Sequence, residues 1–79
     1  MACDYKKALD LANAGKWDAA HVLVQSHSDE LSCQIHGYLH RVEGDIGNAT
    51  YWYGRGGTVL PKNSLEVELA RLYRKIDEA

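Results

Sequence analysis

The residues best suited to chemistry lie together on one stretch of the chain. His36, His40 and Glu43 stand at positions i, i+4 and i+7, so they would form one strip along a helix. Two histidines four residues apart on a helix can grip one metal ion, as they do in zinc-binding helices. No nearby cysteine completes the ligand set, although His21 would add to it if the fold brought it close.

The simpler interpretation gives these histidines a structural role. They flank an apolar stripe, so hydrogen bonds across a helical hairpin, or contact with water, would satisfy their ring nitrogens. On this interpretation, which we prefer from the sequence alone, the protein holds no metal ion and no cofactor. The alternative is a small metal-binding or enzymatic module that uses His36, His40 and Glu43.

Three adjacent aromatic residues, Tyr51-Trp52-Tyr53, form a second candidate site. Successive side chains on a helix point about 100° apart, so the three cannot all face one core. We expect Trp52 and Tyr53 to pack inward and Tyr51 to point towards solvent or a partner; alternatively, its hydroxyl caps a loop. Tyr and Arg are enriched at binding hot spots. The predicted binding residues are Tyr51, Arg55, Arg41, His36 and His40.

No catalytic residue is predicted. An enzyme needs a nucleophile beside a base, or a pair of carboxylates, and Cys33 with His36 or His40 is the only thiol–imidazole neighbourhood in the sequence. A reactive thiol needs an electropositive setting, whereas Glu30 and Glu43 flank this segment. We therefore expect binding rather than catalysis.

Composition narrows the class of partner. The chain has 79 residues, a net charge of −2 and dispersed Lys and Arg, which argues against nucleic-acid binding. No apolar run approaches the roughly 20 residues that span a membrane, and charges interrupt the first ten residues, unlike a secretory signal. We expect a cytoplasmic protein in which Cys3 and Cys33 are free thiols.

The spacing of apolar residues predicts an all-α fold of five helices without strands. The predicted helices cover residues 5–14, 16–25, 30–43, a segment that starts at 45 and fails near Gly56, and 64–78. A linker of residues 58–63 contains the only proline. The whole chain, 1–79, would form a single domain.

Two parts of the chain match at an offset of 29 residues. Gly15 aligns with Gly44, Ala20 with Ala49, and Ala8 with Gly37. A glycine allows a tight exit from a helix, and a small residue allows two helices to cross closely. We therefore predict two repeat-like antiparallel hairpins, about 5–26 and 30–57, closed by a C-terminal capping helix.

The repeated pattern resembles the tetratricopeptide and Sel1-like repeat class over residues 5–57. That family combines a small residue, Gly-Asp-Tyr, Ala and two large residues. The second unit matches it at Gly37, Gly44, Asp45, Ile46, Ala49, Trp52 and Tyr53, and the first unit at Ala8, Gly15, Trp17, Ala20 and Leu23. The period of 29 and the presence of two units only depart from the family, since stacked arrays usually need at least three repeats.

A closer resemblance covers residues 35–55. This segment is similar to a signature of small, uncharacterised, mainly bacterial proteins that contains a histidine-bearing helix, Glu-Gly-Asp, Asn-Ala and Tyr-Trp-Tyr. That family offers no agreed activity to transfer. We therefore expect a helical-repeat-like module that binds a protein or peptide partner.

The partner could be a second copy of the chain. In the C-terminal helix, Leu65, Leu69, Leu72 and Ile76 are spaced by four, three and four residues, which is the spacing of paired helices. We predict a homodimer through this helix. The competing outcome is a monomer whose C-terminal helix folds onto its own hairpins.

Overall fold

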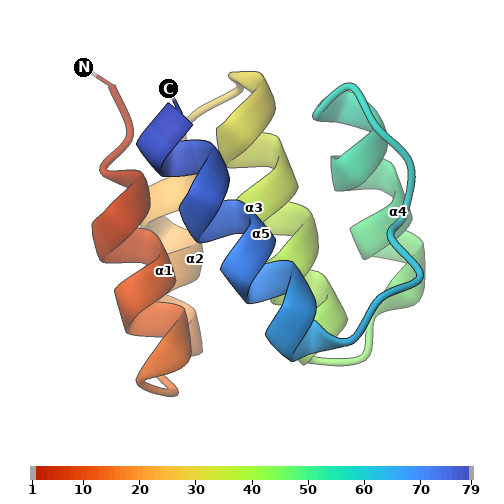
Figure 1. Ribbon diagram of the computed structural model, residues 1–79, viewed down its shortest axis with the longest axis horizontal. Helices are drawn as coiled ribbons and strands as arrows, with labels where there is room; N and C mark the ends of the chain where they lie inside the picture. The colour runs from red at the N-terminus through yellow and green to blue at the C-terminus, as the bar shows by residue number, and fades with distance from the viewer. Residues whose placement is uncertain (1, 79) are drawn as a thin grey trace.

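The computed structural model describes residues 2–78 and contains five α-helices, with no strand among these residues (Figure 1). The helices are α1 (Tyr5–Asn13), α2 (Trp17–Gln25), α3 (Glu30–Val42), α4 (Ile46–Arg55) and α5 (Leu65–Glu78). The predicted all-α fold is confirmed. Within the described residues, every helix is too short and too polar to cross a bilayer.

Local sequence explains where the helices begin. Asp4, Asp29 and Asp45 precede α1, α3 and α4, and each carboxylate accepts a hydrogen bond from the backbone N–H three residues later. These bonds satisfy N–H groups that have no partner within the helix.

Three glycines end helices in the same way. Gly15, Gly44 and Gly57 have φ angles of 78°, 82° and 77°, a left-handed conformation that favours glycine. In each case the next residue donates its N–H to the carbonyl five residues earlier, at 2.8, 2.8 and 3.1 Å respectively. This is the Schellman arrangement. The first two copies lie 29 residues apart, so the offset seen in the sequence is present in the hydrogen bonding.

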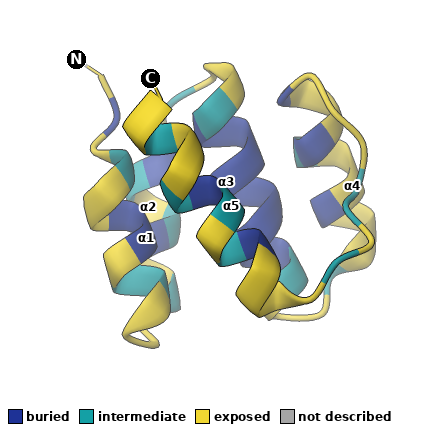
Figure 2. Cartoon of the chain, viewed as in Figure 1, coloured by how far each residue is buried: buried dark blue, intermediate teal, exposed yellow. Residues whose placement is uncertain are grey.

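The centre of the molecule is α3, which contacts each of the other four helices. Every residue from 32 to 40 is buried, and α3 is the most deeply buried helix in Figure 2. Among the described residues, α2 and α4 both pack on α3 but not on each other. A helix covered on all sides must pack its polar side chains against protein rather than water.

Small residues allow this close packing, as predicted. Ala20 and Ala49 are fully buried. A Cβ atom on Gly37 would lie 2.6 Å from Cδ2 of the Tyr53 ring and 3.1 Å from the carbonyl oxygen of Ala49. Gly37 therefore lies where α4 approaches α3 closely.

The apolar stripe of α5 faces the interior of its own chain. Leu72 is fully buried, and Leu69, Tyr73 and Ile76 pack against the core. Leu65 and Val67, at the start of α5, remain exposed. Most of the apolar side chains of α5 therefore pack within their own chain. The homodimer stays a prediction, for which Leu65 and Val67 remain exposed.

A buried carboxylate holds α5 in place. Glu68 accepts hydrogen bonds from the hydroxyl of Tyr53 (2.7 Å), the amide of Asn63 (3.0 Å) and the guanidinium of Arg71 (2.7 and 2.8 Å). Burial alone would raise the pKa of Glu68, but the hydrogen bonds from Arg71, Asn63 and Tyr53 outweigh it and lower the pKa. This network joins α4, α5 and the segment between them.

The close approach at Gly37 generates a test. Gly37→Ala should lower the free energy of unfolding by about 1–3 kcal/mol, because the new methyl group overpacks against the Tyr53 ring. Gly54→Ala is the control, since its methyl group would meet nothing within 4 Å. That variant should gain about 0.5–1 kcal/mol from helix propensity. Urea denaturation of both variants measures the two effects, and two stabilised variants would contradict the packing described.

The buried carboxylate predicts a pH dependence. Glu68→Gln should lose about 1–3 kcal/mol at neutral pH, because an uncharged amide cannot accept all the bonds that the carboxylate accepts. The folded pKa lies below the ordinary value of 4.5, so this stabilisation is present above pH 4.5 and is lost as the pH falls through the folded pKa. The difference between parent and variant should therefore narrow in acid. Chemical denaturation at several pH values tests this, with the exposed Glu66→Gln as a control that stays within about 1 kcal/mol of the parent.

Candidate metal centre

Three of the four histidines of the chain meet between α2 and α3. One ring nitrogen from each of His21, His36 and His40 lies within 4.8 Å of the others, and Nε2 of His36 is 2.9 Å from Nε2 of His21. Nitrogens bound to one tetrahedral zinc ion at about 2.0–2.1 Å would be roughly 3.3 Å apart. The His36–His21 hydrogen bond is shorter than that value and the other separations are at most 4.8 Å, so the rings would need to shift for all three to reach one ion.

The position of α2 brings His21 into the group. Trp17 starts α2 and donates its indole N–H to the carbonyl of Leu39 on α3 at 2.7 Å. His21 lies one turn further along α2 and stacks on the Trp17 ring, with centroids 4.7 Å apart. This hydrogen bond and this stack hold His21 opposite His36 and His40.

Aromatic rings enclose the histidines. The Trp52 ring of α4 stacks on His36 at 3.8 Å, and Trp17 meets His40 edge-on at 5.9 Å. His36 is 3% exposed and His40 8%, whereas His21 is half-buried. The nitrogens therefore lie in a mostly apolar enclosure with one side nearer to solvent.

Glu43 lies behind His40 and not beside the other two histidines. Its carboxylate is 2.6 Å from Nδ1 of His40, which leaves Nε2 of that ring free for another contact. The sequence interpretation treated Glu43 as the third ligand of a strip, but in the structure His21 takes that place. A carboxylate on the remote nitrogen of a histidine fixes the ring and makes it a better ligand.

A second carboxylate near His40, that of Asp45, already accepts hydrogen bonds from Asn48. Asp45 lies close enough to form a group with His40 and Glu43. Its two carboxylate oxygens accept bonds from the backbone and the side-chain amide of Asn48, at 3.1 and 2.7 Å. This carboxylate caps α4, and that role accounts for its position.

The environment favours neutral imidazoles. Burial lowers the pKa of His36 to about 4, with the neighbouring charges of His21 and His40 adding to the effect. Burial, followed by the charge of His40, also lowers the pKa of His21. Neutral imidazole is the form that binds metal ions. In addition, Nδ1 of His36 is buried without a hydrogen-bond partner.

The other predicted binding residues separate into two places. Tyr51 is 55% exposed, and the Arg55 guanidinium lies 5.9 Å from its ring centroid and 5.1 Å from that of Trp52. Tyr51 and Arg55 thus adjoin the histidine group through Trp52. Arg41 instead donates to the side chain and backbone of Asn63, at 2.9 and 2.5 Å.

The thiols offer no nucleophile in this structure. Cys3 and Cys33 are buried and form no disulfide. Burial raises the pKa of Cys33, which disfavours the reactive thiolate. The thiol–imidazole pairing considered from the sequence therefore gains no support from the surroundings of Cys33.

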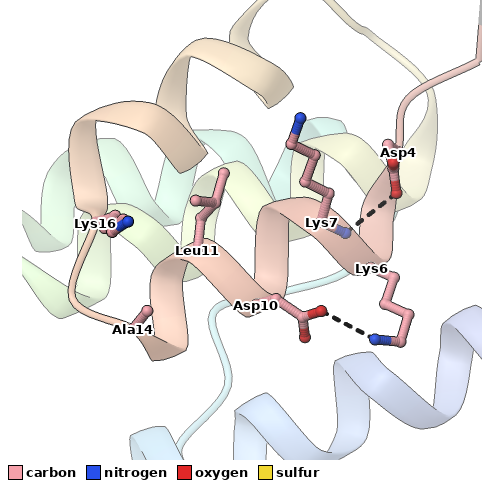
Figure 3. Close-up of a pocket in the computed structure, with 7 residues that line it drawn as sticks. All are labelled: Asp4, Lys6, Lys7, Asp10, Leu11, Ala14 and Lys16. Carbon is pink, nitrogen blue, oxygen red and sulfur yellow. Dashed lines mark hydrogen bonds and ion pairs between the residues drawn. The ribbon is translucent and has the colours of Figure 1, made fainter.

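A shallow hollow of about 390 Å³ is lined by residues of α1 and of the segments next to it (Figure 3). Two of its charged groups already pair, since Nζ of Lys6 is 2.9 Å from the carboxylate of Asp10. Its lining residues are Asp4, Lys6, Lys7, Asp10, Leu11, Ala14 and Lys16. No set of side chains converges there as the three histidines do.

Comparisons with protein-family models, with curated proteins and with solved structures find no match for this chain. The resemblance to tetratricopeptide and Sel1-like repeats accordingly stays a prediction.

Proposed function

We propose that this protein binds one divalent transition-metal ion of the zinc class through His21, His36 and His40. The observation that carries the proposal is the mutual approach of three ring nitrogens, all within 4.8 Å of one another. Two of the rings are nearly inaccessible to water, so they would be ordered before the ion arrives. An ion would join α2 to α3 at the centre of the molecule.

The donor set supports an ion of this class. Imidazole nitrogen suits zinc, copper, nickel and iron, whereas magnesium and calcium prefer oxygen ligands. Glu43 supplies the carboxylate that commonly supports a metal-binding histidine, here on Nδ1 of His40. Nε2 of His36 and Nε2 of His21 share a hydrogen bond, which an ion would replace, whereas the buried Nδ1 of His36 has no hydrogen-bond partner.

Zinc titration of tag-free protein tests the proposal. We expect one ion per chain and a higher melting temperature with zinc, because an ion that binds only the folded state stabilises it. His21→Gln, His36→Gln and His40→Gln should each abolish stoichiometric binding. Glu43→Gln should weaken it about 10- to 100-fold. Calorimetric titration and thermal melts provide the measurements.

His27→Gln is the matched control, since His27 is the remaining histidine and lies outside the group. It should bind zinc as the parent does. Equal binding by all three cluster variants, provided that circular dichroism shows them folded, would refute the proposal. So would zinc binding that leaves the parent's melting temperature unchanged.

The exposed Tyr51 supports a second candidate function, the binding of an acidic peptide segment. Among the described residues, Arg55 has no carboxylate within ion-pair distance, and its guanidinium lies over Tyr51 and Trp52. A planar guanidinium beside an exposed tyrosine is suited to a carboxylate-bearing partner.

Selection from a displayed random-peptide library tests this second function. We expect enrichment of peptides rich in Asp and Glu, with affinity at least about tenfold lower for Tyr51→Ala, as for a hot-spot residue. Val59→Ala is the control, because Val59 is also exposed but lies in the segment between α4 and α5. Selected peptides that bind Tyr51→Ala and the parent equally would exclude this surface.

A further inference from the structure

We infer that two copies of this chain associate through the exposed side of α5, in an antiparallel pair centred on Ala70. The inference is independent of the proposed metal site. It is carried by the side of α5 that the chain leaves uncovered, by the order of charges along that side, and by the small residue at its centre.

The first step is the uncovered side of α5. The helix packs on α1 and α3, and Leu72 is fully buried there. Its outer side is exposed, as Figure 2 shows for much of the helix. Exposed positions recur on that side every four residues, at Glu66, Ala70, Arg74 and Glu78. Residues four apart form a ridge on the surface of a helix, and such ridges interdigitate when two helices pack.

The second step is the order of charges along this ridge. Glu66 and Arg74 carry opposite charges, and each lies four residues from Ala70, or about 6 Å along the helix axis. In an antiparallel pair with its twofold axis at Ala70, Glu66 of one copy therefore lies opposite Arg74 of the other, and this contact occurs twice. A parallel pair would place like charges opposite each other. Lys62 and Glu78 repeat the order of opposite charges eight residues to either side of Ala70.

Both charges are available to a second copy. Among residues 2–78, neither Glu66 nor Arg74 forms an ion pair within its own chain. By contrast, the buried Glu68 is already paired with Arg71. The charges that remain unpaired on α5 are thus on the side that faces away from the core.

The third step is the centre of the ridge. Ala70 has a small side chain, so two helices can approach to the short end of the usual range of roughly 8–10 Å between axes. Val67, one turn before Ala70, is 57% exposed and would be covered by the second copy. Covering this apolar surface favours association. The flanking charges contribute little energy at an exposed surface and instead set the orientation.

The contact is small, so the dimer is reversible. Two helices of 14 residues each bury less surface than the roughly 1,200–2,000 Å² of a standard interface. We expect a dissociation constant on the order of 0.1 mM.

Sedimentation equilibrium over about 0.01–1 mM protein tests the inference, with a chelator present so that no metal ion bridges two copies. The average mass should rise from that of one chain towards that of two. Glu66→Arg and Arg74→Glu each place like charges at both contacts, and each should weaken the dimer at least about tenfold. The double variant restores opposite charges and should dimerise as the parent does. Asp18→Arg is the control, because Asp18 is also exposed and also lies in the first turn of its helix.

Cross-linking through a new cysteine locates the twofold axis. Ala70→Cys should form a disulfide-linked dimer under a mild oxidant, because the two positions face each other and a disulfide requires Cα atoms within about 7 Å. The native Cys3 and Cys33 are buried and should not compete. Ala19→Cys, an exposed position on α2, is the control and should cross-link far more slowly.

Each outcome decides for or against this dimer. The mass of one chain at every concentration would overturn it, and so would a dimer that tolerates both single charge reversals. A folded double variant that stays monomeric, or equal cross-linking at positions 19 and 70, would overturn the antiparallel arrangement about Ala70. Loss of the dimer in both single variants, recovery in the double variant and cross-linking specific to position 70 would support it.

Discussion

The fold depends on the burial of the middle of one helix, residues 32–40 of α3, which is not apolar. α3 packs against all four other helices, so its polar side chains lose water. Transfer of a polar group from water to an alkane, where it finds no hydrogen-bond partner, costs about 4–8 kcal/mol. Ser32 meets this demand through Asp29, and Gln34 through the carbonyl of Gly56. Nε2 of His36 is hydrogen-bonded to His21, but Nδ1 of His36 has no partner. This unsatisfied nitrogen lies at the candidate site.

Packing at the neighbouring position fixes the geometry of the site. Tyr53 of α4 lies against Gly37 of α3, where no side chain intervenes. Adjacent residues on a helix point about 100° apart, so seating Tyr53 there turns Trp52 onto the ring of His36, the residue before Gly37. The same contact that allows α4 to approach α3 therefore builds one wall of the histidine enclosure.

The sequence was informative about features that depend on near neighbours in the chain. Aspartates at helix starts, glycines at helix ends and the apolar stripes predicted all five helices, and the small Gly37 was expected to admit a neighbouring helix. The i, i+4 spacing placed His36 and His40 on one face correctly. Each of these features is set within one or two helical turns.

The rest of the site depends on how helices pack, which spacing alone does not fix. Whether His21 reaches His36 is decided by the angle between α2 and α3, and thus by the hydrogen bond from Trp17 to Leu39. Glu43 shares the strip of the histidines but contacts the outer nitrogen of His40, because that ring turns its other nitrogen inward. A stronger sequence signal was available in the pairing of Trp17 and His21, one turn apart on the same predicted helix.

The aromatic enclosure also gives the protein a spectroscopic property. The chain has two tryptophans, and both indoles contact histidines of the group: Trp17 stacks on His21, and Trp52 stacks on His36. All the intrinsic tryptophan emission of the molecule therefore originates beside these imidazoles. Without any attached dye, the ultraviolet fluorescence of this chain therefore reports on the imidazole rings of His21 and His36.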